Sequence, residues 1–305
     1  MASAVVKVRG LVKDYGRFRA LRGVDLEVQQ GEVFGFIGPN GAGKSTTIRC
    51  ILDLLRPTEG SVEVLGTSDL RGHPEVRARV GYLPGELAMH GSSTVREHLA
   101  YLCELRQGRG AERVEELAAR FGLDLDRRFR GLSKGNKQKV GVVQAFMHTP
   151  DLLILDEPTS GLDPLLQQEF LRLAREAHVG GATLLVSSHI LSEVEAIAGR
   201  VAIIRAGAIV DVEDVAKLRE RAGQHVTLTF DEPPSLEAFS ALPGLEQVSV
   251  EGHTLSAVLH GAPDALLKEA SRHTVTRWTA HDRNLEELFM DHYRPDGAAS
   301  DGDRA

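Results

Sequence analysis

A glycine-rich segment near the N-terminus has the residue types and spacing of a phosphate-binding loop. Residues 38–45 read Gly-Pro-Asn-Gly-Ala-Gly-Lys-Ser and match the pattern G-x-x-x-x-G-K-[ST]. In such a loop the backbone N–H groups point inward at an anion, and the N-terminus of the following helix adds partial positive charge. We expect Lys44 to reach the β- and γ-phosphates of a nucleoside triphosphate and the Ser45 hydroxyl to ligate Mg²⁺. The alternative is a glycine-rich turn that matches by chance.

Two carboxylates and a histidine are the candidate groups for hydrolysis. Asp156 and Glu157 directly follow the apolar residues 152–155, and His189 follows the apolar strand expected at Thr183–Ser188. Parallel strands deliver the side chains at their carboxyl ends to a crevice at one edge of the sheet. With a phosphate loop upstream, Asp156 is the expected partner of Mg²⁺, and Glu157 could orient or deprotonate an attacking water. Taken singly, the acids could merely end a strand at solvent, and a lone histidine is usually a surface or core residue.

The elements that must position these residues are those of an α/β chain. Val33–Ile37 is a short apolar run typical of a buried strand, and the residues from Ser45 onward repeat apolar side chains at helical spacing. Residues 5–9 and 24–28 alternate apolar and polar side chains, as half-buried antiparallel strands do. From about residue 94 to 147 the spacing becomes helical, which predicts an all-helical insertion.

The composition limits the class of protein. The chain has 305 residues and a formal net charge of −7 without a concentrated basic tract, so nucleic acid is not expected as a partner. No apolar run approaches the roughly 18 residues of a membrane span. The two cysteines, Cys50 and Cys103, do not form a Cys-x-x-Cys pair, which favours reduced thiols in a cytoplasmic protein over disulfides or a zinc site.

Taken together, the motifs of residues 1 to about 215 resemble those of the nucleotide-binding subunit of an ATP-binding cassette (ABC) transporter. Six elements match in the order and spacing of that family. They are Tyr15 as the base-stacking aromatic, residues 38–46 as the Walker A loop, residues 132–136 as the signature segment, residues 152–157 as the Walker B strand, residues 160–163 as the loop between paired cassettes, and His189 as the switch histidine.

The resemblance implies a sandwich of two copies of the chain, with ATP between the Walker loops of one copy and the signature segment of the other. Glu157 would be the general base, and His189 would hold the γ-phosphate and the attacking water. Ser45 and Asp156 would hold Mg²⁺. The residues that the resemblance assigns to ATP binding are Tyr15, Gly38, Pro39, Asn40, Gly41, Ala42, Gly43, Lys44, Ser45, Thr46, Ser133, Gly135 and Asp163.

One departure from the family's pattern follows the expected strand that ends at Leu83. The family usually carries a glutamine there, which contacts both Mg²⁺ and the membrane subunit. Here Pro84, Gly85 and Glu86 follow instead. Either Glu86 takes part of the role of the missing glutamine, or water fills it.

A second departure lies in the signature segment. Lys134 and Asn136 stand where glycine and glutamine are usual, whereas Ser133 and Gly135, which are expected to contact the γ-phosphate, are kept. Lys134 could add a cation near that phosphate or could simply be solvated. Signatures with lysine resemble those of bacterial exporters whose membrane subunits are separate six-helix permeases, often for antibiotics or other lipophilic molecules.

The region after residue 221 has its own apolar pattern and no catalytic constellation. Its expected order is strand, helix, strand, strand, helix, strand, which suggests a small ferredoxin-like fold. The expected strands are residues 226–230, 246–250, 254–259 and 275–278, and the expected helices are residues 236–242 and 264–272. A final helix is expected at residues 284–293, and a disordered tail at residues 295–305.

The predicted fold is therefore α/β. Residues 1–221 would form a P-loop NTPase cassette with a mixed central sheet, an antiparallel β subdomain and a helical insertion, and residues 222–294 a small α+β accessory domain. The function expected from the resemblance is an ATP-hydrolysing subunit that powers an exporter through a separate permease, at the inner face of the cell membrane.

A soluble cassette ATPase that acts on ribosomes or DNA is the alternative function. Such relatives generally carry two tandem cassettes or a long coiled coil, whereas this chain has one Walker A loop and no sustained heptad run. A third alternative is a kinase that transfers a phosphoryl group. The chain has no acceptor-site motif of the kind a kinase needs, and a kinase function would leave residues 132–136 unexplained.

Overall fold

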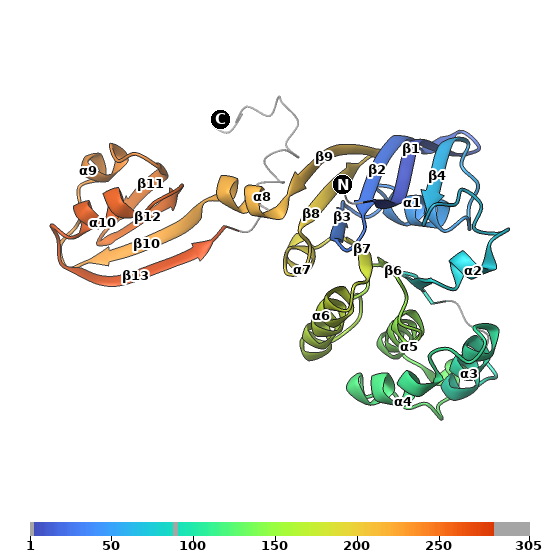
Figure 1. Cartoon of the computed structure of the whole chain (residues 1–305). Coiled ribbons are helices and arrows are strands. Elements are labelled where there is room, and N and C mark those ends of the chain that lie inside the picture. The colour runs from blue at the N-terminus through green and yellow to red at the C-terminus, as the bar shows by residue number, and fades with distance from the viewer. Residues whose placement is uncertain (1–2, 88–90, 284–305) are drawn as a thin grey trace, which may run out of the picture. The chain divides into compact units, whose positions relative to one another are not determined.

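The computed structural model describes residues 3–87 and 91–283 (Figure 1). The chain divides after Glu213 into two compact units. The helix expected at residues 284–293 and the tail expected at residues 295–305 lie outside the described residues.

The central sheet of the first unit has the strand order β5-β6-β7-β3-β8-β9. Its strands are β3 (Val33–Ile37), β5 (Val80–Leu83), β6 (Leu152–Asp156), β7 (Thr183–Ser188), β8 (Arg200–Arg205) and β9 (Ala208–Asp214). The pairs from β5 to β8 are parallel, and every residue of β3, β6 and β7 is buried. Continuous apolar runs of this kind are typical of parallel strands that are covered on both faces. Because these strands are parallel, their carboxyl ends meet at one edge of the sheet.

A second sheet, with the order β2-β1-β4, confirms the expected antiparallel β subdomain. Its strands are β1 (Ala4–Tyr15), β2 (Phe18–Gln29) and β4 (Glu59–Val64). The strands expected at residues 5–9 and 24–28 are parts of a longer hairpin, and Tyr15 is the last residue of β1. The register shifts several times along β1 and β2, and these irregularities interrupt the alternation from which strand length is predicted.

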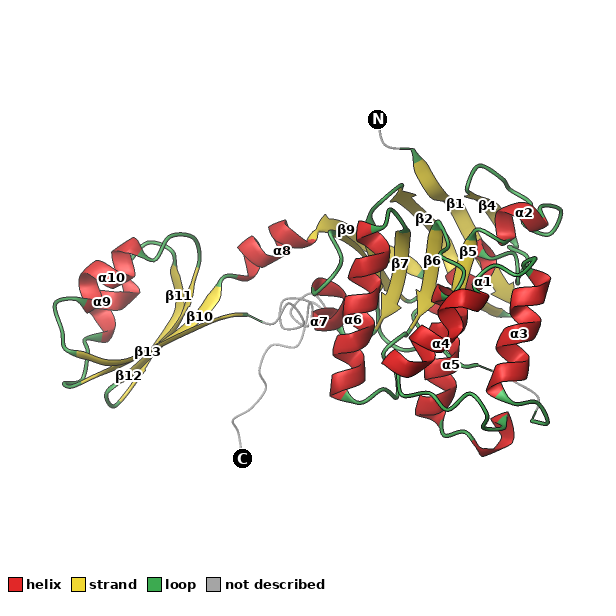
Figure 2. Cartoon of the chain, turned by 60° about the horizontal axis from the view of Figure 1, so that its bottom comes forward, coloured by secondary structure: helices red, strands yellow, loops and turns green. Residues whose placement is uncertain are grey.

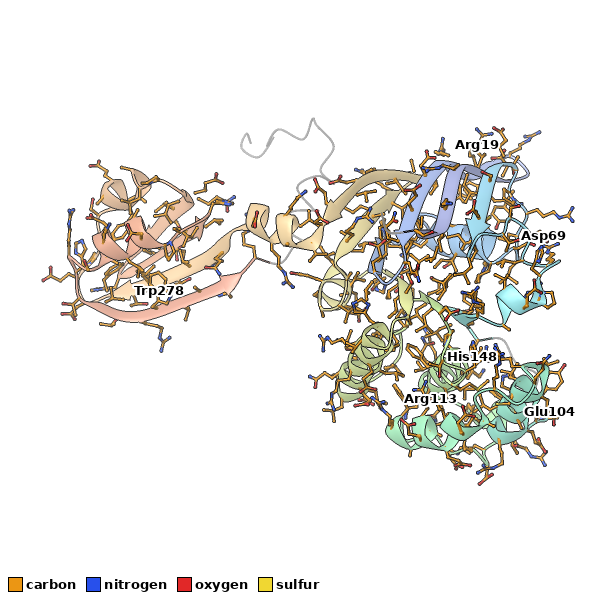
Figure 3. All side chains as sticks on the ribbon, viewed as in Figure 1. Arg19, Asp69, Glu104, Arg113, His148 and Trp278 are labelled. Atoms are coloured by element: carbon orange, nitrogen blue, oxygen red, sulfur yellow. The ribbon has the colours of Figure 1, made fainter. Side chains whose placement is uncertain are left out.

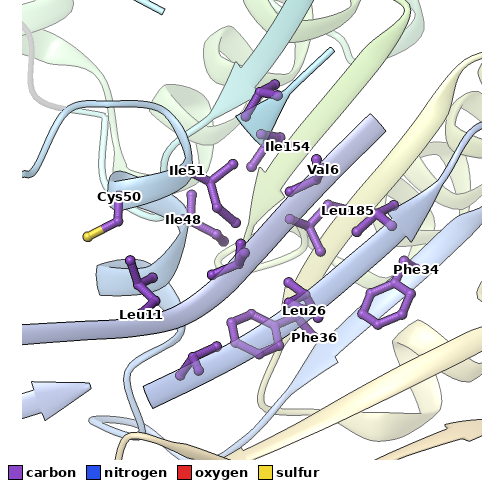
Figure 4. Close-up of a cluster of buried hydrophobic side chains, with 14 of the residues drawn as sticks. Val6, Leu11, Leu26, Phe34, Phe36, Ile48, Cys50, Ile51, Ile154 and Leu185 are labelled. Carbon is purple, nitrogen blue, oxygen red and sulfur yellow. The ribbon is translucent and has the colours of Figure 1, made fainter. Parts of the chain in front are cut away.

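Helix α1 (Lys44–Ile51) lies between the two sheets and contacts strands of both. Its buried residues Ile48 and Ile51 belong to a cluster with Val6 of β1, Phe36 of β3 and Ile154 of β6 (Figure 4). The helix that begins at the phosphate loop is therefore fixed by a buried apolar cluster that includes residues of both sheets.

The helical insertion between β5 and β6 is confirmed, with helices α3, α4 and α5 packed on one another (Figures 1 and 2). Its elements are α3 (Val95–Leu105), α4 (Ala111–Arg120), the 3₁₀ turn η1 (Phe129–Gly131) and α5 (Lys134–Phe146), with the short α2 (Pro74–Arg77) before β5. Thr94 and Glu97 form a capping box at the start of α3. Arg120 of α4 forms ion pairs with Glu169 and Glu176 of α6 (Pro164–Val179), which joins the insertion to the core.

His148 links the end of the insertion to the central sheet (Figure 3). Its Nε2 lies 3.3 Å from the carbonyl oxygen of Val80 in β5. Burial, together with the charge of Arg106, lowers the pKa of His148 to about 4. The imidazole is therefore neutral near pH 7 and acts as a buried structural group.

The second unit has the element order strand, helix, strand, strand, helix, strand after helix α8 (Val215–Ala222). Its elements are β10 (Gln224–Phe230), α9 (Leu236–Ser240), β11 (Leu245–Glu251), β12 (Thr254–Leu259), α10 (Asp264–Ala270) and β13 (Val275–Asp282). The sheet order is β11-β12-β10-β13 with every pair antiparallel, an arrangement of the ferredoxin-like type. Alternate residues of β10, namely Val226, Leu228 and Phe230, are buried in the core of this unit. Trp278 on β13 is partly exposed (Figure 3).

Gly35 of β3 offers a test of this packing. A Cβ added there would overlap Val194 Cγ1 of α7 (Leu191–Glu195) and lie 2.7 Å from Val201 Cγ1. We expect Gly35→Ala to lower the free energy of unfolding by about 1–3 kcal/mol through overpacking. Gly199→Ala is the control, because nothing lies within 4 Å of a Cβ there. Thermal melting of both variants provides the measurement, and equal melting temperatures would contradict the packing described.

Candidate functional site

The phosphate loop connects β3 to α1 and closes around the ammonium group of Lys44. The Lys44 Nζ donates hydrogen bonds to the carbonyl oxygens of Gly38, at 2.6 Å, and of Pro39, at 3.3 Å. A Cβ at Gly38 would overlap the Ile204 carbonyl oxygen, and Gly43 has a φ of 115° with Leu21 2.7 Å from where a Cβ would stand. Side chains are therefore excluded from both positions. The loop's outer residues Pro39, Asn40 and Gly41 are exposed.

Lys44 is 6% exposed and has one carboxylate partner in the described structure. Glu157 Oε1 lies 3.1 Å from its Nζ. A buried ammonium is costly unless it is paired and hydrogen-bonded, and two carbonyl oxygens and this carboxylate meet that requirement. This ion pair joins the phosphate loop to the carboxylate that follows β6.

Glu157 holds an uncommon backbone conformation, with a φ of 49°. Its N–H donates to the Ser187 carbonyl oxygen at 3.1 Å, and the Gln138 Nε2 donates to its carbonyl oxygen at 3.2 Å. Strained conformations of this type cost about 1–3 kcal/mol and persist where the surroundings fix them. The conformation turns the carboxylate back toward the phosphate loop.

His189 contacts the carboxylate of Glu157, which in turn contacts Lys44. Its Nδ1 lies 2.7 Å from Glu157 Oε2, so the two carboxylate oxygens of Glu157 contact His189 and Lys44 separately. The imidazole is 43% exposed, whereas Glu157 is 17% exposed. The arrangement presents a carboxylate and an imidazole beside a cationic phosphate loop.

Asp156 is 1% exposed at the carboxyl end of β6, and its Oδ1 accepts a hydrogen bond from Ser187 Oγ at 2.6 Å. Sequence reasoning missed both Ser187 and Gln138. Ser187 of the neighbouring strand β7 lies opposite Asp156 in the sheet. A hydroxyl residue near the end of that strand was therefore the signal available in the sequence.

Gly85 lies beside Asp156, since a Cβ at Gly85 would be 3.5 Å from Asp156 Oδ2. The Glu86 side chain is exposed.

The remaining candidate residues lie on other elements. Ser133 is the N-cap of α5 and accepts from the Asn136 N–H at 3.3 Å. Asp163 is the N-cap of α6. Tyr15, at the end of β1, is 46% exposed.

Gly135 packs against the loop that precedes α6, with the Gly161 carbonyl oxygen 2.6 Å from where a Cβ would stand. Over the described part of the chain, no hydrogen bond or ion pair links Tyr15, Ser133 or Asp163 to Lys44.

A phosphate loop between a parallel strand and a helix, with acids at the end of a neighbouring strand, defines a P-loop nucleoside triphosphatase. The family profile described as "ABC transporter" matches residues 21–160. The chain is 35% identical over 225 residues to the bacitracin transport ATP-binding protein BcrA of Bacillus licheniformis, an alignment that covers 72% of each chain. It is also 35% identical over 257 residues to the daunorubicin resistance ATP-binding protein DrrA3 of Streptomyces coeruleorubidus, with 82% of this chain and 81% of that protein covered.

Solved structures agree with these relatives. An ATP-binding subunit of an ABC transporter is 33% identical, with a TM-score of 0.65, and the match covers 71% of this chain and 92% of that one. A dimeric bacterial ABC transporter cassette is 25% identical, with a TM-score of 0.60, and the match covers 69% of this chain and 98% of that one. The chain belongs to the ATP-binding proteins of the ABC transporter family, and it binds and hydrolyses ATP. None of the helices in residues 3–87 and 91–283 has the length and apolar character that crossing a membrane requires.

The buried environment of Lys44 predicts its effect on nucleotide binding. Lys44→Ala should weaken ATP binding by about 10- to 100-fold, because a charged hydrogen-bond donor to phosphate is lost. Titration calorimetry with ATP provides the measurement. Lys7→Ala is the control, since Lys7 pairs with Glu63 in the second sheet, and its ATP affinity should not change. An ATP affinity of Lys44→Ala within threefold of the unchanged chain would contradict the assignment.

Proposed function

We propose that this chain is the ATP-hydrolysing subunit of an exporter, acting at the inner face of the cell membrane through a separate six-helix permease. The observation that carries the hydrolytic part is the contact of Glu157 with both Lys44 and His189. The names of the relatives, which concern bacitracin transport and daunorubicin resistance, support export of lipophilic or antibiotic molecules. Those relatives do not favour the alternative of a cassette that acts on ribosomes or DNA.

ATP and Mg²⁺ fit the groups present. Lys44 would contact the β- and γ-phosphates, with the loop's amides around them. Oxygen ligands suit Mg²⁺, and the Ser45 hydroxyl and the Asp156 carboxylate would hold it. Ser187 supports this role for Asp156, because its hydroxyl fixes Oδ1. Mg²⁺ would neutralise negative charge on the phosphates.

Glu157 would act as the general base for hydrolysis. A γ-phosphate at Lys44 supplies that ammonium with a second anionic partner, and Glu157 Oε2 remains beside His189. The carboxylate would take a proton from water as the water oxygen bonds to the γ-phosphorus and the bond from that phosphorus to the β–γ bridging oxygen breaks, which releases ADP and phosphate. The imidazole would orient the water and the γ-phosphate. The fixed backbone of Glu157 supports this role, since a base must be held within hydrogen-bond reach of the proton it removes.

A second copy of the chain would complete the site. Ser133 is exposed at the N-terminus of α5, where it can meet a phosphate of another molecule. The contact between Gly135 and Gly161 ties the signature segment to the loop before Asp163, so both would reach the partner together. Tyr15 would stack on the adenine base. The dimeric cassette to which the chain is similar supports this arrangement.

The second unit, after Glu213, would be an accessory domain of the cassette. The residues proposed to bind or hydrolyse ATP all precede it. It offers no group to the chemistry described above.

Glu157→Gln tests the hydrolytic role. The amide keeps the shape of the side chain but cannot accept the proton, so the rate should fall by about 10²- to 10⁴-fold, roughly 3–5 kcal/mol of barrier, while ATP still binds. Phosphate release gives the rate, and size-exclusion chromatography with Mg²⁺ and ATP should show a dimer that accumulates. Glu104→Gln is the control, because Glu104 is exposed on α3 (Figure 3). If Glu157→Gln hydrolyses ATP at more than about a third of the rate of the unsubstituted chain, the assignment of Glu157 as the base is contradicted.

A cavity beside β5 would receive a segment of the permease. Its volume is about 390 Å³, and its lining combines apolar side chains, among them Leu52, Leu70 and Tyr82, with the cations Arg71, Arg77 and Arg106 and one carboxylate, Asp53. Burial lowers the pKa of the Arg106 guanidinium, and the Asp53 carboxylate in the same lining forms its ion pair with Arg71. Its Nη1 donates to the Leu102 carbonyl oxygen at 3.2 Å. An acidic side chain flanked by apolar residues would complement this cavity.

Arg106→Gln tests the docking site. We expect the variant to bind the co-expressed permease about tenfold more weakly in detergent, because one partner of a desolvated ion pair is lost. Basal ATP hydrolysis should be unchanged, since Arg106 contacts none of the residues around Lys44. Arg109→Gln removes the same charge from an exposed position nearby and should bind normally. Equal permease binding by both variants would reject the cavity as the docking site.

A further inference from the structure

Glu193 lies on the helix that follows His189 and accepts two hydrogen bonds from buried hydroxyl groups. Its Oε2 accepts from Thr159 Oγ1 at 2.6 Å and from Ser188 Oγ at 2.9 Å. Thr159 is 4% exposed and Ser188 is 1% exposed. Thr159 lies in the loop after β6, whereas Ser188 is the last residue of β7, so one carboxylate oxygen joins the loop after Glu157 to the strand end that precedes His189.

These two segments carry Glu157 and His189, the two groups that meet at the proposed hydrolytic site. Thr159 follows Glu157 after one intervening residue, and Ser188 immediately precedes His189. The Ser188 hydroxyl also accepts from the Ile190 N–H at 3.0 Å, which fixes the backbone on the other side of His189. The bonds to Glu193 therefore lie beside the 2.7 Å contact between His189 Nδ1 and Glu157 Oε2.

We infer that Glu193 is a positioning residue for hydrolysis, which holds the His189 loop against the Glu157 loop. The inference rests on the roles proposed above for Glu157 and His189. A carboxylate is an acceptor-only group and can serve two hydroxyl donors at once. Without it, both buried hydroxyls lose their acceptor, and the loops shift until water or other groups satisfy them. Displacements of about 1 Å in such a site can cost about 100-fold in rate.

The matched variants are Glu193→Ala, Glu193→Gln and Ser192→Ala. Glu193→Ala removes the acceptor, whereas Glu193→Gln keeps one acceptor oxygen and should restore part of the rate. Ser192→Ala changes an exposed side chain of the same helix and is the control. We expect Glu193→Ala to lower kcat by about 10- to 100-fold and to change KM for ATP by less than about threefold, because the phosphate loop is untouched.

A double-variant cycle with Thr159→Val tests the specific bond. Valine keeps the shape of threonine and removes its hydroxyl. If the two residues act through one bond, Thr159→Val combined with Glu193→Ala should be no slower than Glu193→Ala alone. Thr159→Ser keeps the hydroxyl and should retain most of the rate, which also tests the bond if Glu193→Ala fails to fold.

The outcomes separate this inference from the proposed function. A normal kcat for Glu193→Ala, or multiplied losses in the double variant, overturns the positioning role, provided that Glu157→Gln is inactive. A rise in the KM of Glu193→Ala for ATP with an unchanged kcat also overturns the positioning role, because the loss is then in ATP binding. A normal rate for Glu157→Gln would overturn the proposed site itself. A normal kcat for Thr159→Val overturns the role of the bond, even where Glu193→Ala cannot be purified.

Discussion

The burial of one ammonium group, that of Lys44, is the constraint on which the candidate site depends. A cation that is 6% exposed requires partners, and it has the Gly38 and Pro39 carbonyl oxygens and the Glu157 carboxylate. The loop closes around it only because glycine stands where side chains would overlap Ile204 and Leu21. The charge proposed to bind phosphate therefore also binds the carboxylate proposed to act in hydrolysis.

The parallel sheet brings motifs that are distant in the sequence together in one site. Strand β7 lies between β3, which leads into the phosphate loop, and β6, which ends at Asp156. Because the strands are parallel and in register, Asp156 lies opposite Ser187, and His189 comes directly after the end of β7 at Ser188. The left-handed backbone of Glu157 then directs its carboxylate between the loop and the imidazole. The hydrogen bond that the Glu157 N–H donates to Ser187, and the one that Gln138 donates to the Glu157 carbonyl oxygen, hold that turn in place.

The sequence predicts the groups of this site better than it predicts how they are held. The phosphate loop, the acids after β6 and the histidine after β7 each follow a recognisable local pattern, and the family and the α/β fold are confirmed. The supporting bonds of Ser187 and Glu193 depend on which strands are neighbours and on their register, which no local pattern contains. The sequence predicts β1 and β2 to be shorter than they are, because bulges break the alternation that indicates a strand.

Glu157 and His189 are proposed to act as one unit in hydrolysis. Single-turnover hydrolysis of bound ATP by Glu157→Gln, His189→Ala and the double variant is the measurement that distinguishes one unit from two independent groups. If the two residues share one function through their 2.7 Å contact, the double variant should be no slower than the slower single variant. Losses that multiply in the double variant would show that the two residues act independently in hydrolysis.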